Sequence, residues 1–262
     1  MVINLSDKKF FIKSSYADDW TRWIRERNRS TDYELRFFNL IKAKHNEIIV
    51  EIGSGEGRIA KKLLEYPIYY IGVDISQKIL VYAKTELEKL FNSGFYFIEA
   101  DAEFLPFKRA INKVFFLNSL FFVPNRFKAL NNTRNILKEN GKLLLDNSNV
   151  LNLYYILYFL YGKVRQFAKI IANHVGLIRK LIRIVRKRDY NPYFRPGSKG
   201  NFFIYNWELK RLNFRNIRYI GELTSLQKYF LKLIPNTRIQ QLIYDKFLKF
   251  FSARLIIEAQ VE

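Results

Sequence analysis

The chain has 262 residues, 49% of them hydrophobic, and a formal net charge of +21. This length suits one large α/β domain, and the apolar fraction is high enough to bury a core. The chain contains no cysteine, and its two histidines are His45 and His174. This composition excludes disulfides, cysteine nucleophiles and thiolate or histidine-rich metal centres, so no metal is expected. Residues 1–10 are polar and show no secretory signal, which makes a cytoplasmic location the expectation.

The strong positive charge indicates an acidic partner, either nucleic acid, an anionic membrane or an acidic substrate. A general bias of the composition toward Lys and Arg is the plain alternative. The charge is unevenly distributed along the chain, which favours a specific role for at least part of it.

Residues 10–45 predict two N-terminal cap helices, over 16–29 and 31–44. Three aromatic residues of the first helix are candidates for ligand contact: Tyr16, Trp20 and Trp23. Packing of these rings on a sheet explains the same pattern.

A strand, a glycine turn and a helix follow one another from residue 47. The apolar run 48–52 leads into Gly53, Gly55 and Gly57, and a helical pattern begins at Ile59. Glycine allows positive φ and lets a ligand approach the backbone closely, and the helix that follows offers unpaired N–H groups. This stretch predicts a ligand site.

The next two predicted strands, 69–74 and 95–101, both end on an acid, Asp74 and Asp101. An acid at the first of these positions suits the two hydroxyls of a ribose, and the second can reach the exocyclic amine of an adenine. The turn reads Gly-x-Gly-x-Gly rather than the Gly-x-Gly-x-x-Gly of a pyrophosphate loop. It therefore suits a nucleoside without phosphates, such as S-adenosyl-L-methionine, although a nicotinamide dinucleotide remains a rival.

These segments resemble the class I S-adenosylmethionine-dependent methyltransferases of the type 11-like group, which acts mostly on small molecules and on quinone or lipid precursors. The resemblance is carried by residues 51–57, 72–76, 100–107 and 135–145. It implies that the following residues bind the cofactor: Glu51, Gly53, Ser54, Gly55, Gly57, Asp74, Ile75, Asp101, Ala102 and Asn118. The family often has an Asp before its fourth strand, where this chain has Asn112, so Asn112 receives no role.

The alternation of strands and helices over 47–148 predicts a parallel sheet with helices on both faces. With the resemblance, the expected fold is α/β: a Rossmann-like, seven-stranded, mostly parallel sheet with a helical lid insertion. We expect a single methyltransferase domain over 1–262, in which 46–149 is the cofactor-binding half and 201–262 is the C-terminal part of the sheet. A late antiparallel strand pair is predicted at 216–221 and 253–261.

The ends of the fourth and fifth predicted strands, 114–118 and 143–145, should meet at the ligand edge of the sheet. This makes Asn118 a candidate for the pocket, with a role in capping a turn as the alternative. Residues 146–149 reach the same edge, and nothing in the sequence selects one of them.

Residues 150–200 do not fit the pattern of the core. The apolar run 153–161 is far shorter than the roughly 20 residues that span a bilayer. An apolar stripe then alternates with nine cations and no acid over 163–188. Three interpretations stay open: a lid on the core, an interfacial helix on an anionic membrane, and a phosphate-binding arm for RNA.

The sequence thus predicts an enzyme that transfers a methyl group from S-adenosyl-L-methionine to a small-molecule or lipid-like acceptor by in-line displacement. It assigns no catalytic base. The alternatives are an RNA methyltransferase that uses 163–188, a nicotinamide-dependent oxidoreductase, and a non-catalytic protein that binds nucleic acid or membrane. A cytoplasmic protein with peripheral membrane contact fits the favoured prediction.

Overall fold

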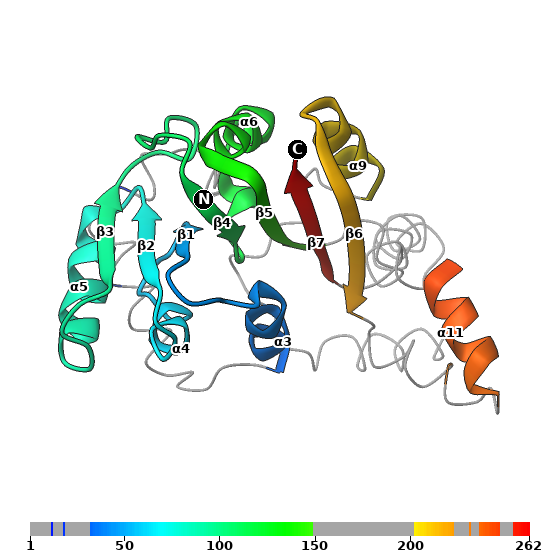
Figure 1. The fold of residues 1–262 in the computed structure, drawn as a ribbon, viewed down its shortest axis with the longest axis horizontal. Helices are drawn as coiled ribbons and strands as arrows, with labels where there is room; N and C mark the ends of the chain where they lie inside the picture. Colours follow the sequence, from blue (N-terminus) through cyan, green and yellow to red (C-terminus); the bar gives the residue numbers. More distant parts are fainter. Residues whose placement is uncertain are drawn as a thin grey trace, which may run out of the picture.

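A computed structural model describes residues 12, 18, 32–148, 202–222, 231, 236–246 and 254–262. It contains a seven-stranded sheet in the order β3-β2-β1-β4-β5-β7-β6 (Figure 1). The strands are β1 (Ile48–Ile52), β2 (Tyr69–Asp74), β3 (Phe95–Glu99), β4 (Ile111–Phe116), β5 (Leu137–Ser148), β6 (Phe214–Glu222) and β7 (Arg254–Val261). The helices are α3 (Asp32–Ile41), α4 (Ala60–Leu63), α5 (Gln77–Glu88), the 3-10 turn η1 (Leu120–Phe122), α6 (Arg126–Ile136), α9 (Phe202–Arg211) and α11 (Thr237–Lys246).

Strands β1 to β5 pair in parallel, and β7 runs antiparallel between β5 and β6. The central strands are buried on both faces, as their apolar sequences predict. The expected Rossmann-like, mostly parallel sheet is therefore confirmed. The antiparallel pairing of the last two strands is confirmed as well, but β6 keeps the direction of β1 to β5 and β7 alone is reversed.

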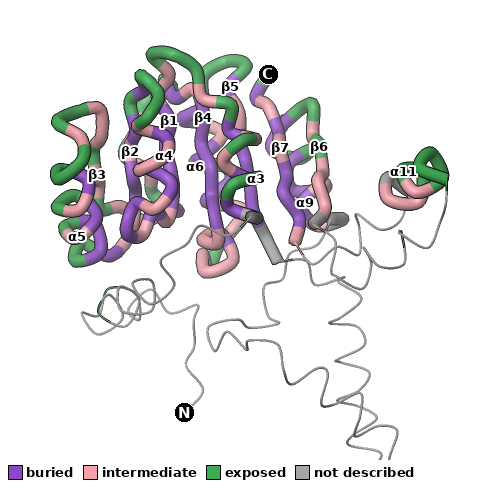
Figure 2. The backbone as a smooth tube through the Cα atoms, turned by 90° about the horizontal axis from the view of Figure 1, so that it is seen from below, coloured by how far each residue is buried: buried purple, intermediate pink, exposed green. Residues whose placement is uncertain are grey.

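Helices cover both faces of the sheet, and each face has its own core. On one face, α6 and α9 contribute Leu130 and Leu209 to a core with Val114 and Leu143. On the other, α3 and α4 contribute Phe37 and Leu63. Figure 2 shows the buried residues concentrated in the strands between these layers, whereas α11 is largely exposed.

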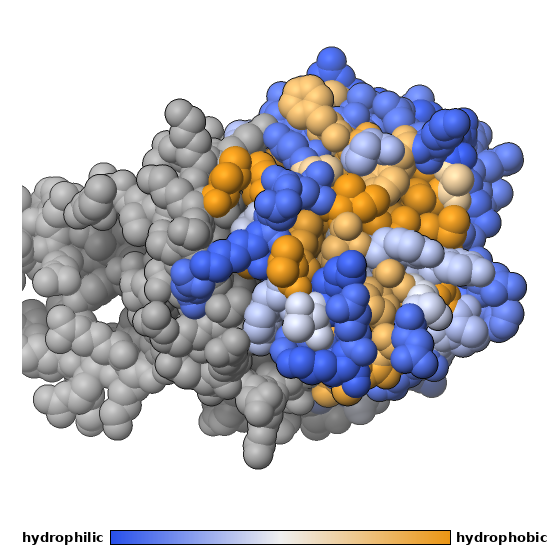
Figure 3. All heavy atoms as spheres, turned by 90° about the vertical axis from the view of Figure 1, so that its left-hand side faces the viewer, coloured by the Kyte–Doolittle hydropathy of each residue, from blue (hydrophilic) through white to orange (hydrophobic). Residues whose placement is uncertain are grey.

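The β3 edge of the sheet is more exposed than the centre. Its burial pattern has no buried residue, and Tyr96 is 61% exposed. Seen from this side, hydrophobic residues lie at the surface among polar ones (Figure 3). The cause is positional, because β3 has one strand neighbour and a connection without a helix leads from it to β4.

Several element boundaries differ from the expectation. β4 begins three residues before Val114, and β5 extends from Leu137 to Ser148, so that Asp146 lies inside a strand rather than beyond it. The helix predicted over 31–44 corresponds to α3, which ends three residues earlier, at Ile41. The proposed first cap helix with Tyr16, Trp20 and Trp23, and the basic insertion 150–200, lie outside the described residues. No helix in the described part of the chain is long and apolar enough to cross a membrane.

Candidate functional site

A cavity of about 1000 Å³, including its open mouth, lies at the carboxyl ends of β1, β2 and β4. Parallel strands bring these ends together, because each strand leaves the sheet at the same edge. The cavity is lined by 21 residues, among which nine of the ten predicted cofactor residues appear: Glu51, Gly53, Ser54, Gly55, Asp74, Ile75, Asp101, Ala102 and Asn118. Gly57 is the exception. It has φ +72° and lies next to Phe97 and Leu87, so it contributes to the conformation of the turn rather than to the cavity lining.

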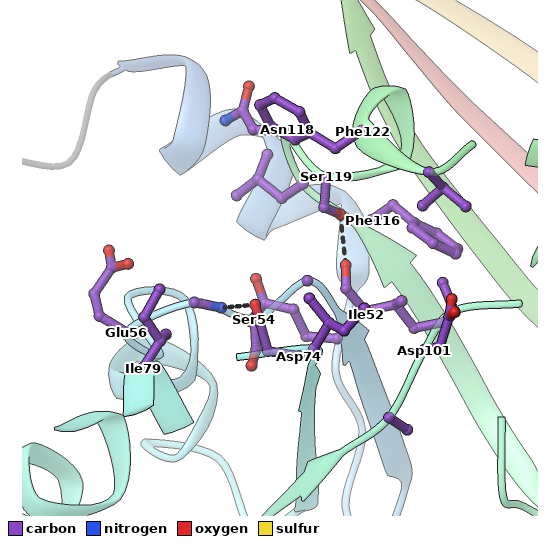
Figure 4. A pocket seen from close by; sticks show the side chains of 18 of the residues that line it. Ile52, Ser54, Glu56, Asp74, Ile79, Asp101, Phe116, Asn118, Ser119 and Phe122 are labelled. Atoms are coloured by element: carbon purple, nitrogen blue, oxygen red, sulfur yellow. Dashed lines mark hydrogen bonds between the residues drawn. The ribbon is translucent and has the colours of Figure 1, made fainter. Parts of the chain in front are cut away.

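The glycine turn is held against β2 by the backbone. The N–H groups of Gly53 and Ser54 both donate to the Val73 carbonyl, at 2.7 and 3.0 Å. Gly53 has φ +75°, and a Cβ built on it would lie 2.3 Å from the Cβ of Ser119. Ser119 in turn donates to the Ile52 carbonyl at 2.5 Å (Figure 4). Glycine is therefore required at position 53 for two reasons: the backbone has a positive φ, and the loop that follows β4 approaches it closely.

Asp74, the last residue of β2, fastens the same turn. Its Oδ2 accepts the Gly55 N–H at 3.0 Å (Figure 4), and its Oδ1 accepts the Ser76 N–H, also at 3.0 Å. Burial raises the pKa of Asp74, and these N–H bonds counteract part of that rise. Because a carboxylate oxygen accepts more than one hydrogen bond, both oxygens keep capacity for hydroxyl groups in the cavity.

Glu51 is 3% exposed at the floor of the cavity. It accepts a 2.6 Å hydrogen bond from the hydroxyl of Tyr70, which is fully buried on β2. Burial raises the pKa of Glu51 to about 8, against the lowering effect of the Tyr70 hydrogen bond. The sequence did not predict Tyr70 as its partner, since the residue reads only as an apolar position of a strand.

Asp101 lies two residues beyond the end of β3 and not within the strand. Its Oδ1 accepts the Glu103 N–H at 2.9 Å, which forms a tight turn and presents Ala102, 8% exposed, to the cavity. Asp101 and Asp74 thus reach the cavity from the two neighbouring strand ends.

Asn118 has φ +57° and follows β4. Its N–H donates to Asp146 Oδ2 at 3.2 Å, and Arg254 of β7 donates to both Asn118 Oδ1 and Asp146. Since a guanidinium only donates, Oδ1 must face Arg254 and the amide N–H₂ group is turned elsewhere. In Figure 4, Asn118 and Phe122 lie away from Asp74, beyond Ser119.

Two charged residues that we did not predict line the cavity beside the glycine turn. Arg58 pairs with Glu56 at 3.0 Å and with Glu34 of α3 at 2.7 Å. Glu34 is only 5% exposed, so this ion triad fastens the N-terminal helix to the turn. The Glu-x-Arg spacing after Gly55 was a visible signal, but nothing in the sequence pointed to Glu34.

An apolar wall, also not predicted, closes the cavity on the side of β4. It consists of Phe116, Leu117, Phe122, Val123 and Pro124. The run 120–124 begins four residues after the end of β4, so its place near the cavity could have been inferred from the sequence. The 3-10 turn η1 at its start could not. Asn112, to which we gave no role, accepts the Ile48 N–H at 3.0 Å and joins β4 to the start of β1.

The site combines a glycine turn, two strand-end carboxylates and an apolar wall, an arrangement that fits a nucleoside with an adjoining apolar ligand. No group of acidic and histidine residues in the described part of the chain is arranged to hold a metal ion.

Comparison with known families agrees with this geometry. Residues 50–145 match the model of the methyltransferase domain. This segment runs from β1 to β5 and contains all ten predicted cofactor residues. A comparison with curated proteins gives no match.

Solved structures of methyltransferases share the fold. The phosphoethanolamine N-methyltransferase 2 of Haemonchus contortus, in complex with phosphomonomethylethanolamine and S-adenosylhomocysteine, gives a TM-score of 0.54 at 16% identity. It covers 86% of this chain, and the match spans about half, 52%, of the Haemonchus chain.

Two smaller proteins match over nearly their whole length. A Thermotoga maritima methyltransferase, named as a possible histamine N-methyltransferase, gives a TM-score of 0.57 at 16% identity, with 95% of this chain and 97% of that chain covered. A TehB-like methyltransferase from Corynebacterium glutamicum gives 0.56 at 12% identity, with 95% and 100% covered. The domain match identifies residues 50–145 as a methyltransferase domain, and the chain shares the fold of solved S-adenosylmethionine-dependent methyltransferases.

Proposed function

We propose that the enzyme transfers the methyl group of S-adenosyl-L-methionine to a small-molecule or lipid-like acceptor. The observation that carries this proposal is the apolar wall formed by Phe116, Leu117, Phe122, Val123 and Pro124. A wall of this kind favours an acceptor with an apolar body over a highly charged one. The likeness to the Haemonchus and Thermotoga enzymes supports the fold alone, so the acceptor class rests on the wall.

We propose one orientation for the cofactor in the cavity. In this proposal Asp74 binds the ribose hydroxyls, and Asp101 with Ala102 borders the adenine beside Ile75. The glycine turn at Gly53 and Gly55 holds the methionine part, with Glu51 and Ser54 below it. Asn118 faces the acceptor end.

Transfer needs alignment more than acid–base chemistry. The sulfonium makes the methyl group electrophilic and leaves as a neutral thioether, so the protein mainly orients the acceptor along the C–S bond. Orientation alone contributes about 7–11 kcal/mol to such reactions. The wall from Phe116 to Pro124 contains no ionisable side chain among the residues that line the cavity. We therefore propose an acceptor atom that attacks without losing a proton to this wall, such as a free amine or an already ionised oxygen.

The test uses methyl-labelled S-adenosyl-L-methionine with extract of the source cells, followed by separation into organic, small-molecule, nucleic-acid and protein fractions. Label in the organic or small-molecule fraction supports the proposal. Label in RNA contradicts it and favours an RNA methyltransferase, in which the basic stretch 163–188 would grip phosphates. A variant with Asp74→Ala serves as the control for label transferred by other enzymes.

A further inference from the structure

One surface outside the cavity combines exposed aromatic rings with cations. We call it the α6–α9 surface. It consists of Phe104, Phe127, Lys128, Trp207, Lys210 and Arg211. Helices α6 and α9 lie on the same face of the sheet and share one core. Phe104, from the connection between β3 and β4, joins this surface through its contact with Lys128 of α6.

Two of the aromatic side chains on this surface are far more exposed than side chains that pack in a core. Trp207 is 57% exposed and Phe104 is 64% exposed. Phe127 packs partly on the core, with its ring centroid 6.4 Å from that of Trp207. Large exposed rings on a helix face are characteristic of interaction sites.

The charges on this surface have one sign. Helix α6 contains no acid, and the one acid of α9, Glu208, is 6% exposed and bound to Arg126 by two hydrogen bonds. Lys210 and Arg211 are exposed. The surface therefore presents cations to solvent without exposed carboxylates from these helices, and an anionic partner complements it.

The arrangement of the rings favours a lipid surface over stacked bases. Arg211 lies over both Trp207 and Phe127, at 5.1 and 5.4 Å from the ring centroids, and Lys128 Nζ lies 3.2 Å from the centroid of Phe104. A base stacks on a bare ring face, and a cation already occupies one face of each exposed ring. Insertion of ring edges between lipid headgroups needs no bare face, and Trp with Lys or Arg is the usual composition of membrane interfaces.

The surface begins beside the mouth of the cavity. Pro124 lines the cavity, Asn125 caps α6 by accepting the Lys128 N–H at 3.0 Å, and Phe127 and Lys128 follow in the first turn. A membrane on this surface would therefore lie next to the apolar wall.

We propose that the α6–α9 surface binds anionic membranes. This inference goes beyond methyl transfer and does not depend on the acceptor, although a lipid-like acceptor would reach the cavity most directly from such a membrane.

The test measures sedimentation of the full chain with vesicles of phosphatidylcholine and with vesicles in which one third of the lipid is phosphatidylglycerol. The variant combines Lys128→Gln, Trp207→Ala and Lys210→Gln. Each lysine near an anionic surface contributes about five-fold to binding, so the two lysines alone predict a loss of about 25-fold on the anionic vesicles. Binding of the unaltered chain should also weaken as salt is raised.

The matched control is Lys61→Gln with Lys62→Gln in α4, which removes two charges on the opposite face of the sheet. It should bind anionic vesicles like the unaltered chain, and melting curves verify that both variants are folded. Equal vesicle binding by the α6–α9 variant, or an equal loss in the α4 control, overturns the proposal. The proposal is also overturned if the unaltered chain binds an RNA oligonucleotide but no vesicles, and the α6–α9 variant loses this RNA binding. That result assigns the surface to nucleic acid.

Discussion

At the scale of single residues, Asp74 joins the glycine turn to β2 by accepting the Gly55 N–H, and it also accepts the Ser76 N–H while facing the cavity. Hydrogen bonds to a charged group contribute about 1.5–3 kcal/mol each. We expect Asp74→Ala to weaken S-adenosyl-L-methionine binding by about 10- to 100-fold, measured by calorimetry. The control is Glu99→Ala, because Glu99 pairs in register with Asp74 on β3, is exposed and does not line the cavity. Unchanged affinity in Asp74→Ala would remove the ribose assignment.

Substitution of Gly53 tests how closely the loop that follows β4 packs on the glycine turn. Gly53→Ala places a Cβ 2.3 Å from the Cβ of Ser119 and forces alanine to φ +75°. The left-handed backbone alone costs about 1–2 kcal/mol, and the overlap adds to this. We expect a lower free energy of unfolding in urea, and the second change Ser119→Gly should restore part of it by removing the overlap. No recovery in the double variant would mean that the backbone conformation accounts for the whole loss.

Glu51 makes stability depend on pH. Its pKa is raised by burial from 4.5 to about 8, so the folded protein holds a proton that the unfolded chain releases. This contribution to stability is complete below pH 4.5 and is lost as the pH rises toward 8. Glu51→Gln keeps an acceptor for Tyr70 and cannot ionise. As the pH rises from 4.5 to 8, the melting temperature of the unaltered protein should fall relative to that of Glu51→Gln. Melting temperatures that change in parallel would contradict the raised pKa of Glu51.

The predicted residues that line the cavity are those whose place follows from their position in the chain. Gly53, Asp74 and Asp101 stand at strand ends, and strand ends are readable from apolar runs. Glu34 and Arg254 were missed because each reaches the site from a distant part of the chain, through α3 and β7. Sequence spacing carries no information about such contacts.

At the scale of elements, Arg254 links β7 to the edge of the sheet that bears the cavity. Asp146 of β5 is fully buried and pairs with Arg254 of β7, which also holds Asn118 of the β4 loop. Removing one partner of a buried pair leaves an uncompensated charge, so we expect Arg254→Gln to lower the free energy of unfolding by about 3 kcal/mol. Arg215→Gln on β6 is the control, because its pair with Glu262 is exposed and should contribute under about 1 kcal/mol. If urea denaturation shows that both variants lose the same free energy of unfolding, the larger contribution of Arg254 is refuted.

Strand identities were predictable, and strand ends were less so. β2 has the predicted bounds because its run of apolar and aromatic residues continues without a break up to Asp74. β4 begins earlier than expected because polar residues Asn112 and Lys113 are paired inside the sheet, with Asn112 bonded to Ile48 and Lys113 to Glu47. Buried polar residues with partners look like loop residues in a sequence.

At the scale of the whole molecule, cofactor binding and folding are linked. A ligand that binds the folded chain at 100 times its dissociation constant adds about 2.7 kcal/mol of stability. S-adenosylhomocysteine should therefore raise the melting temperature, and NADH at the same concentration should not. The reverse result would favour the nicotinamide-dependent alternative. The Asp74→Ala variant should respond weakly to S-adenosylhomocysteine, which ties the shift to the cavity.

The position of β7 has a consequence for synthesis on the ribosome. Residues 254–261 pair with β5 on one side and β6 on the other, and bury Ile257 and Val261 in the sheet. When β6 emerges, the strand that separates it from β5 has not yet been made. A nascent chain therefore exposes the open edge of β5 until residues 254–261 have left the ribosome, and chaperones that recognise exposed strand edges can bind during this interval.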